Sequence, residues 1–182
     1  MIKKIVFFIF IFLSISCDYF EKSNNNISTY RVAKSKSQNF NNLNNTLFTW
    51  DAPDLWIKGA PSEMRLASFL IPYSDGNADL SISQLNGDGG GIVQNVNRWR
   101  RQLNLYSLDL EQIQSSAING KSKIGKYSIY EIINKEDFSK AFLCAMMPFN
   151  NQTIFIKLNC TINGIKDIKD DFIKFCNSFS PK

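Results

Sequence analysis

The amino-acid sequence predicts an α+β domain: a largely antiparallel sheet with one helix in its N-terminal half and a C-terminal helix, both packed on the sheet. Three observations support this prediction. Apolar and polar residues alternate over 78–85, which is typical of a half-buried strand. Apolar residues recur every three or four positions over 92–105 and 165–179, which is typical of amphipathic helices. The other predicted strands are joined by links of hairpin length, which favours antiparallel pairing.

The first half of the domain is predicted to hold three strands and a helix. The strands are expected at 47–50, which ends before Pro53, at 64–71, which Pro72 stops, and at 78–85. A glycine-rich turn, Gly87–Gly91, then leads into a helix over about Ile92–Leu105. The apolar stripe of this helix comprises Ile92, Val96, Trp99 and Leu103.

The second half is predicted to hold a short helix, four strands and the closing helix. Ser107 is expected to cap the short helix, Leu108–Ser115. The pair Asn150-Asn151 is expected to form the hairpin turn between the last two strands. The four strands are expected at 116–124, 127–133, 141–147 and 153–160, and the closing helix at 165–179. Its buried stripe comprises Ile165, Ile168, Phe172, Phe175, Cys176 and Phe179.

The N-terminus has the features of an export signal. A short cationic segment, Met1–Lys4, precedes an apolar run, Ile5–Leu13, which is shorter than the ~20 residues that span a bilayer. Ser14–Ser16 and Cys17 follow, and this arrangement resembles a bacterial lipobox, with Ser14 where leucine is usual. The resemblance implies that Cys17 becomes the first residue of the mature chain and carries the lipid. The alternative is an ordinary signal peptide with an incidental cysteine.

Three parts of the chain follow from this: a signal peptide (1–16), the lipidated Cys17 with a flexible Asn/Ser-rich tether (17–45), and one α+β domain (46–182). The tether contains too little apolar surface to offset its ordering entropy. Each buried CH₂ of the acyl chains contributes ~0.8 kcal/mol, so the sequence predicts a protein anchored to a lipid bilayer through Cys17. We expect it on the cell membrane or the outer membrane, facing the periplasm or the exterior.

Charge and composition exclude several functions. Residues 46–182 contain 15 Lys and Arg against 14 Asp and Glu, so the domain lacks the positive surplus that nucleic-acid binding needs. The sequence contains no histidine, which excludes Ser-His-Asp and Cys-His catalysis and removes the commonest zinc ligand. No cofactor and no metal are expected. Trp50, Trp56 and Trp99 are expected to be core anchors first, with ligand stacking as the alternative.

Two stretches carry a resemblance to known proteins. The first begins with Trp50-Asp51-Ala52-Pro53-Asp54-Leu55-Trp56, and the second contains Gly89-Gly90-Gly91 followed by Asn95-Val96-Asn97-Arg98-Trp99-Arg100-Arg101-Gln102. Together they resemble a family of uncharacterised exported bacterial lipoproteins with a GGG…N-x-N-R-W-R-x-Q signature. The layout of the whole domain also resembles the PsbP-like α/β/α sandwich. These resemblances imply an accessory or binding role and assign no reaction.

The turn Gly87–Gly91 is the most informative segment of the domain. Glycines at a helix N-terminus can present backbone N–H groups to an anion. However, the turn matches neither a Walker loop nor a G-x-G-x-x-G fingerprint, and Asp88 would repel an anion or cap the helix. A tight structural turn is the alternative to a site. The predicted binding residues are Gly89, Gly90, Gly91, Asn95, Arg98 and Arg101.

Arg98 and Arg101 share a helix face, and guanidinium groups suit carboxylate or phosphate recognition. The alternative is a solvated helix side. Cys144 and Cys160 lie in strands predicted to be adjacent, so a disulfide is conceivable, whereas a buried free thiol is expected at Cys176.

The sequence therefore predicts a non-catalytic binding or accessory lipoprotein of the cell envelope, with a possible envelope protein partner. The alternatives are a receptor for a small anionic ligand at Gly87–Gly91, and an enzyme that works without histidine.

Overall fold

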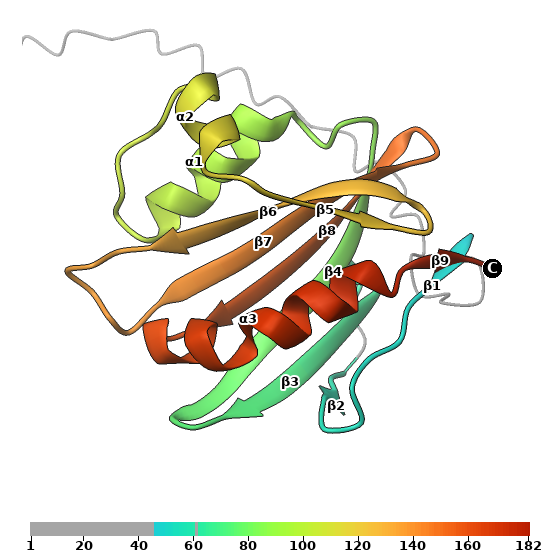
Figure 1. Cartoon of the computed structure of the whole chain (residues 1–182), viewed down its shortest axis with the longest axis horizontal. Coiled ribbons are helices and arrows are strands. Elements are labelled where there is room, and N and C mark those ends of the chain that lie inside the picture. The colour runs from blue at the N-terminus through green and yellow to red at the C-terminus, as the bar shows by residue number, and fades with distance from the viewer. Residues whose placement is uncertain (1–45, 61) are drawn as a thin grey trace, which may run out of the picture. The chain divides into compact units, whose positions relative to one another are not determined.

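Seven strands form the central sheet in the computed structural model, which describes residues 46–60 and 62–182 (Figure 1). Their order across the sheet is β2-β3-β4-β8-β7-β6-β5, and every neighbouring pair is antiparallel. The strands are β2 (Ile57–Lys58), β3 (Ala67–Tyr73), β4 (Gly76–Asn86), β5 (Ile118–Ser122), β6 (Gly125–Ile133), β7 (Ala141–Phe149) and β8 (Gln152–Cys160). The predicted signal peptide, Cys17 and the tether lie outside the described residues.

Helices cover both faces of this sheet (Figure 1). Helix α3 (Ile162–Asn177) packs on one face, while α1 (Ile92–Gln102) and α2 (Leu110–Ser115) pack on the other. Successive side chains of β8 point to opposite faces of the sheet and so to different cores. Ile154 and Ile156 belong to the core beneath α3, and Phe155 belongs to the core beneath α1. The predicted α+β class, with a largely antiparallel sheet and helices packed on it, is confirmed. None of the helices in the described ranges is long and apolar enough to cross a membrane.

A second, two-stranded sheet joins the two ends of the domain. Strand β1 (Phe48–Thr49) pairs with β9 (Ser180–Pro181). Phe48 stacks on Phe179 with ring centroids 5.8 Å apart, and Trp50 stacks on the same ring at 5.4 Å. Strands β2 and β9 were not predicted, because two residues are too few to show a period.

Turn chemistry explains the β7–β8 hairpin. Asn150 and Asn151 have φ angles of 48° and 57°, and asparagine tolerates this left-handed region better than most residues. Two successive positive φ angles give the turn whose twist matches that of paired strands. The predicted Asn150-Asn151 turn is confirmed.

Several predicted element boundaries are wrong. Strand β3 continues through Pro72 to Tyr73. Pro72 lies beside the hairpin turn and beyond the residues that pair with β2, so no hydrogen bond to β2 requires its missing N–H. Helix α1 ends at Gln102 rather than Leu105, since the backbone at Asn104 turns to a φ of 56°.

The helix caps also differ from the predictions. Asp109, not Ser107, caps α2: its carboxylate accepts from Gln112 N at 2.8 Å, and Gln112 Oε1 accepts from Asp109 N at 3.1 Å. Helix α3 begins three residues earlier than predicted, because Thr161 Oγ1 accepts from Gly164 N at 3.1 Å. Phe179 is buried but lies beyond the end of α3.

The disulfide considered for Cys144 and Cys160 does not form. The β7–β8 register places Lys157 opposite Cys144 and Ala141 opposite Cys160, so the two thiols lie three positions apart on opposite sheet faces. Both are buried and free, as is Cys176, whose predicted state is confirmed. Burial raises the pKa of Cys160 to about 12 and raises the pKa of Cys144 and Cys176 as well.

These three thiols are expected to be unreactive in the folded protein. The thiolate is the nucleophile, and a raised pKa keeps each sulfur protonated at mildly alkaline pH. In a Cys17→Ala variant, which leaves these three as the remaining cysteines, we expect Ellman's reagent to give no fast colour with the folded protein and to detect all three thiols in concentrated guanidinium chloride. A fast reaction before unfolding would contradict the burial of these residues.

Candidate functional site

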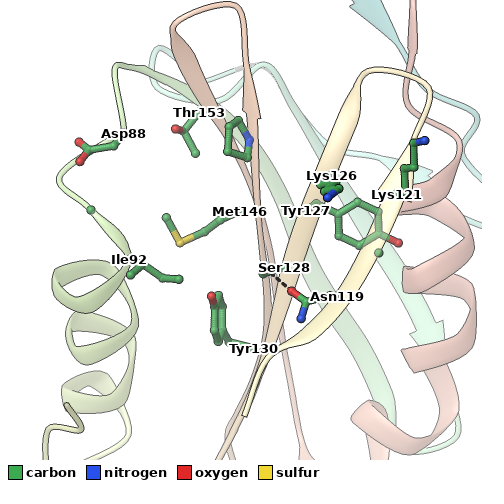
Figure 2. Close-up of a pocket in the computed structure, with 13 residues that line it drawn as sticks. Asp88, Ile92, Asn119, Lys121, Lys126, Tyr127, Ser128, Tyr130, Met146 and Thr153 are labelled. Atoms are coloured by element: carbon green, nitrogen blue, oxygen red, sulfur yellow. Dashed lines mark hydrogen bonds between the residues drawn. The ribbon is translucent and has the colours of Figure 1, made fainter. Parts of the chain in front are cut away.

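An open groove lies between the start of α1 and the β5–β6 hairpin (Figure 2). Its volume is about 950 Å³, at the upper end of the range usual for small-molecule sites. One wall carries Asp88 and Gly91 of the glycine turn with Ile92 of α1. The hairpin, β7 and β8 supply the remainder: Asn119, Gly120, Lys121, Lys126, Tyr127, Ser128, Tyr130, Met146, Pro148 and Thr153.

Strand pleating places the polar hairpin residues on one face. Lys126, Ser128 and Tyr130 alternate along β6 and therefore point to the same side of the sheet. The β5–β6 register sets Asn119 opposite Ser128 and Lys121 opposite Lys126. Ser128 Oγ donates to Asn119 Oδ1 at 2.7 Å.

Tyr130 holds the most unusual polar group of the groove. Its side chain is 2% exposed and belongs to the core beneath α1, yet its hydroxyl has no hydrogen-bond partner among the described residues. Figure 2 shows the ring with its oxygen directed toward the space between Ile92 and Asn119. Burial raises the pKa of Tyr130, an effect only partly offset by the nearby Ser128 hydroxyl. The hydroxyl is therefore a neutral donor at the pH values of ordinary physiology.

The two groove lysines also lack a partner. Lys121 and Lys126 stand directly opposite each other on neighbouring strands, an arrangement that is unfavourable for like charges. Neither forms an ion pair with any residue in the described part of the chain. Asp88, on the far wall, is the one carboxylate among the lining residues.

The backbone N–H groups of Gly89, Gly90 and Gly91 are hydrogen-bonded within the glycine turn. Gly89 N donates to Asn86 O at 3.3 Å and Gly91 N to Asp88 O at 3.2 Å. Gly90 N donates to Asp88 Oδ1 at 2.9 Å. The amides of the three predicted binding glycines are thus used within the turn, an arrangement that favours the structural role over anion binding.

The buried side chains of Asn95 and Asn97 hold neighbouring backbone segments in place through hydrogen bonds. Asn95 Nδ2 donates to Gly89 O at 3.1 Å and to Gly91 O at 2.7 Å, which fixes the turn to the first turn of α1. Asn97 holds the chain between the helices, because its Nδ2 donates to Leu108 O and its Oδ1 accepts from Leu108 N, both at 2.8 Å. Their exposed fractions are 1% and 7%, so neither presents its amide to solvent.

The structure brings only part of the predicted site together. Gly91 lines the groove with Asp88, while Gly89 and Gly90 lie in the turn beside it. Arg98 is exposed and donates to Asn95 Oδ1, and Arg101 is exposed at the end of α1. Neither arginine is among the residues that line the groove.

The residues from β5 and β6 were not predicted as a site. The available signal was the polar residue at every second position of a strand, Lys126, Ser128 and Tyr130. The predicted strand at 127–133 was assigned no functional residue, and the Tyr130 ring belongs to the core. No group of three or more potential metal ligands occurs within the described ranges.

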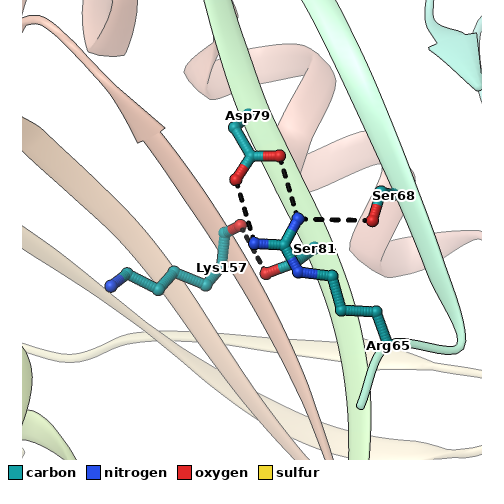
Figure 3. A network of polar contacts seen from close by, with 5 residues as sticks. All are labelled: Arg65, Ser68, Asp79, Ser81 and Lys157. Atoms are coloured by element: carbon teal, nitrogen blue, oxygen red, sulfur yellow. Dashed lines mark hydrogen bonds and ion pairs between the residues drawn. The ribbon is translucent and has the colours of Figure 1, made fainter. Parts of the chain in front are cut away.

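A second polar cluster lies on the same sheet face, over β3, β4 and β8 (Figure 3). Arg65 forms two bonds with Asp79, Nη1–Oδ1 at 3.1 Å and Nη2–Oδ2 at 3.2 Å, and Nη1 also donates to Ser68 Oγ at 3.3 Å. Lys157 Nζ lies 3.8 Å from the centre of the Phe142 ring and donates to Gln102 Oε1 at 2.6 Å.

Burial lowers the pKa of Lys157. Each cation of this second cluster has partners inside the protein, unlike the lysines of the groove.

Comparisons with known proteins give structural neighbours only. No family model and no curated protein matches the chain. A crystal structure from Bacteroides thetaiotaomicron VPI-5482 is 15% identical, with a TM-score of 0.41 over 75% of this chain and 45% of that one. The solution structure of cyanobacterial PsbP (CyanoP) from Synechocystis sp. PCC 6803 is 16% identical, with a TM-score of 0.48 over 75% of this chain and 87% of that one.

This chain thus spans less than half of the Bacteroides protein. A PsbP protein is among the structural neighbours, as the predicted layout anticipates, and the likeness concerns the fold alone.

Two glycines of the turn make a matched pair for mutation. Gly87 and Gly89 have φ angles of 62° and 61°, so alanine is strained equally at both. A Cβ at Gly87 would meet nothing within 4 Å, whereas one at Gly89 would lie 2.5 Å from the Phe155 ring. That ring is buried against Trp99 and has little room to move.

We expect Gly87→Ala to lower the free energy of unfolding by about 1 kcal/mol, the cost of the left-handed backbone. Gly89→Ala should lower it by about 3 kcal/mol, because overpacking against Phe155 adds to the same strain. Urea denaturation followed by tryptophan fluorescence measures both. Equal losses would show that the Gly89–Phe155 contact has no energetic weight.

Proposed function

We propose that this chain is a lipid-anchored, non-catalytic binding protein of the cell envelope, and that its domain holds a small ligand in the groove beside α1. Membership of the exported lipoprotein family with the GGG…N-x-N-R-W-R-x-Q signature is part of this proposal. The leader and Cys17 support the envelope location, and the groove supports the binding role.

The observation that carries the binding role is the Tyr130 hydroxyl. Buried polar groups are nearly always hydrogen-bonded, and leaving one unsatisfied costs about 1–3 kcal/mol. A ligand with an acceptor atom in the groove would remove that cost. Such a ligand would also contact Ile92, Met146 and Pro148, which supply apolar surface around the hydroxyl.

The groove suits binding better than turnover. General acid–base chemistry needs a positioned group with a pKa near the working pH. Asp88, the carboxylate of the groove, already accepts the Gly90 N–H, and the Tyr130 pKa is displaced upward. The groove therefore offers hydrogen bonds, charge and apolar contact for holding a molecule.

Removing the acylated side chain tests the anchor. Cys17→Ala takes away the proposed attachment point for the lipid. We expect loss of labelling by radioactive palmitate and release of the protein from membranes after a high-salt wash. Unchanged membrane retention would refute the anchor, and Cys176→Ala is the control because that thiol is buried.

Tyr130→Phe tests the groove. We expect this variant to raise the free energy of unfolding by about 1 kcal/mol, since it removes an unsatisfied buried hydroxyl. Tyr127→Phe is the matched control: Tyr127 Oη donates to Asn177 Oδ1 at 2.6 Å, so its loss should lower stability by about 1 kcal/mol.

Tyr130→Phe should also weaken ligand binding. The probes are two benzophenones, 4-benzoylbenzoate and its neutral N-methylamide, whose ketone accepts a hydrogen bond and forms photochemical cross-links. With the full-length protein in phosphatidylcholine vesicles, we expect cross-links at Met146 or Ile92, weakened by Tyr130→Phe and retained in Tyr106→Phe, which changes an exposed tyrosine outside the groove. Absence of groove labelling by both probes would refute the proposed function.

A further inference from the structure

We propose that the ligand of this groove is an organic anion with an apolar body, whose carboxylate or phosphate lies between Lys121 and Lys126 and whose body reaches Tyr130. This inference rests on the proposed function and adds the chemical class of the ligand. It follows from the placement of charge around the groove, taken together with the position of the Tyr130 hydroxyl.

The lysine pair is the first part of the argument. Directly opposite residues on an antiparallel pair have Cβ atoms roughly 5 Å apart, so two ammonium groups on one face repel each other. The hairpin contains no acid between or beside Lys121 and Lys126 that would relieve this repulsion. An oxyanion between them would convert a repulsive pair into two charge-assisted hydrogen bonds.

Three cations in the described part of the chain form ion pairs: Arg65, Lys169 and Lys174. Arg65, in the segment before β3, forms a two-bond ion pair with Asp79 of β4 on this sheet face. Lys169 likewise pairs with Glu131 at 2.6 Å on the other face. The groove lysines have no such partner among the described residues, and they line the same groove as the unsatisfied Tyr130 hydroxyl. This combination points to a partner from outside the chain.

Asp88 sets the orientation of the ligand. It lies on the wall opposite the hairpin, as Figure 2 shows, so a ligand anion is repelled from the turn and attracted to the lysines. Between these poles the groove is lined by Ile92, Met146 and Pro148, and by Ser128 and Asn119, which are hydrogen-bonded to each other. The part of the ligand that crosses the groove is therefore apolar.

The strand fixes the scale of the ligand. Lys126 and Tyr130 are four residues apart on β6, a separation of roughly 13 Å at the usual rise per residue. Because Lys126 can bend toward the tyrosine, an anion and an acceptor separated by one aromatic ring can reach both. The Tyr130 hydroxyl then donates to that acceptor, which supplies the partner that the described residues do not provide.

The experiment compares 4-benzoylbenzoate with its neutral N-methylamide on the full-length protein in phosphatidylcholine vesicles. Both probes share the body and the ketone and differ in the charge. We expect the carboxylate to bind about tenfold more tightly, as expected for two partly exposed ion pairs. The double variant Lys121→Gln/Lys126→Gln should bind the two probes equally.

Lys135→Gln/Lys140→Gln is the matched control. It removes the same charge from exposed lysines at the opposite end of β6 and should keep the preference for the carboxylate. Circular dichroism should show that both double variants remain folded. Adding phosphatidylglycerol to the vesicles identifies the source of the anion: it competes with the probe if the ligand is a membrane lipid and leaves labelling unchanged if the ligand is soluble.

Each failure has a separate meaning. If both probes label the groove equally well in the wild-type protein, the anion assignment is overturned while the proposed function stands. If the two double variants lose the preference to the same extent, the effect is one of net charge, and the lysine assignment is overturned. If neither probe labels the groove, the proposed function fails and this inference fails with it.

Discussion

The rest of the structure depends on one constraint, which is that a sheet with apolar side chains on both faces must be covered on both. Helix α3 covers one face together with the aromatic contacts of Phe48 and Phe179. On the other face, α1 and α2 cover the central strands, where the core runs from Trp99 to Tyr130. Beyond that core the sheet surface becomes polar. The groove is therefore set by how far the helix layer extends, and its polar residues are those that no helix covers.

Buried polar groups on the α1 side differ in a way that bears on function. Asn95 and Asn97 use their amides to hold the glycine turn and the chain before α2, so their burial is compensated. The Tyr130 hydroxyl is buried to a similar degree without compensation among the described residues. Phenylalanine would fill the same space without that penalty, which is why the proposed binding role rests on this hydroxyl.

Periodicity predicted the sheet and the two long helices because it reports which face of an element is buried. It could not place Asn95 and Asn97, whose partners lie in a turn and in the segment before α2, and Asn95 was predicted as a binding residue. Periodicity also gives no information on how two strands are aligned. Cys144 and Cys160 lie on adjacent strands as predicted, but the β7–β8 register offsets them by three residues. The groove depends on both tertiary contacts and strand register, so Gly91 is the one predicted binding residue that lines it.

The near balance of charge in the domain conceals how its charges are distributed. Where a cation lies close to an acid, as at Arg65 with Asp79 or Lys174 with Asp171, the structure pairs them. Lys121 and Lys126 repel each other instead, in the same groove as the unsatisfied hydroxyl. Each feature lowers stability by itself, and one bound anion with an acceptor on its body would remove both penalties. Two independent departures from folding rules in one groove, relieved by one kind of molecule, are what a site selected for binding would show.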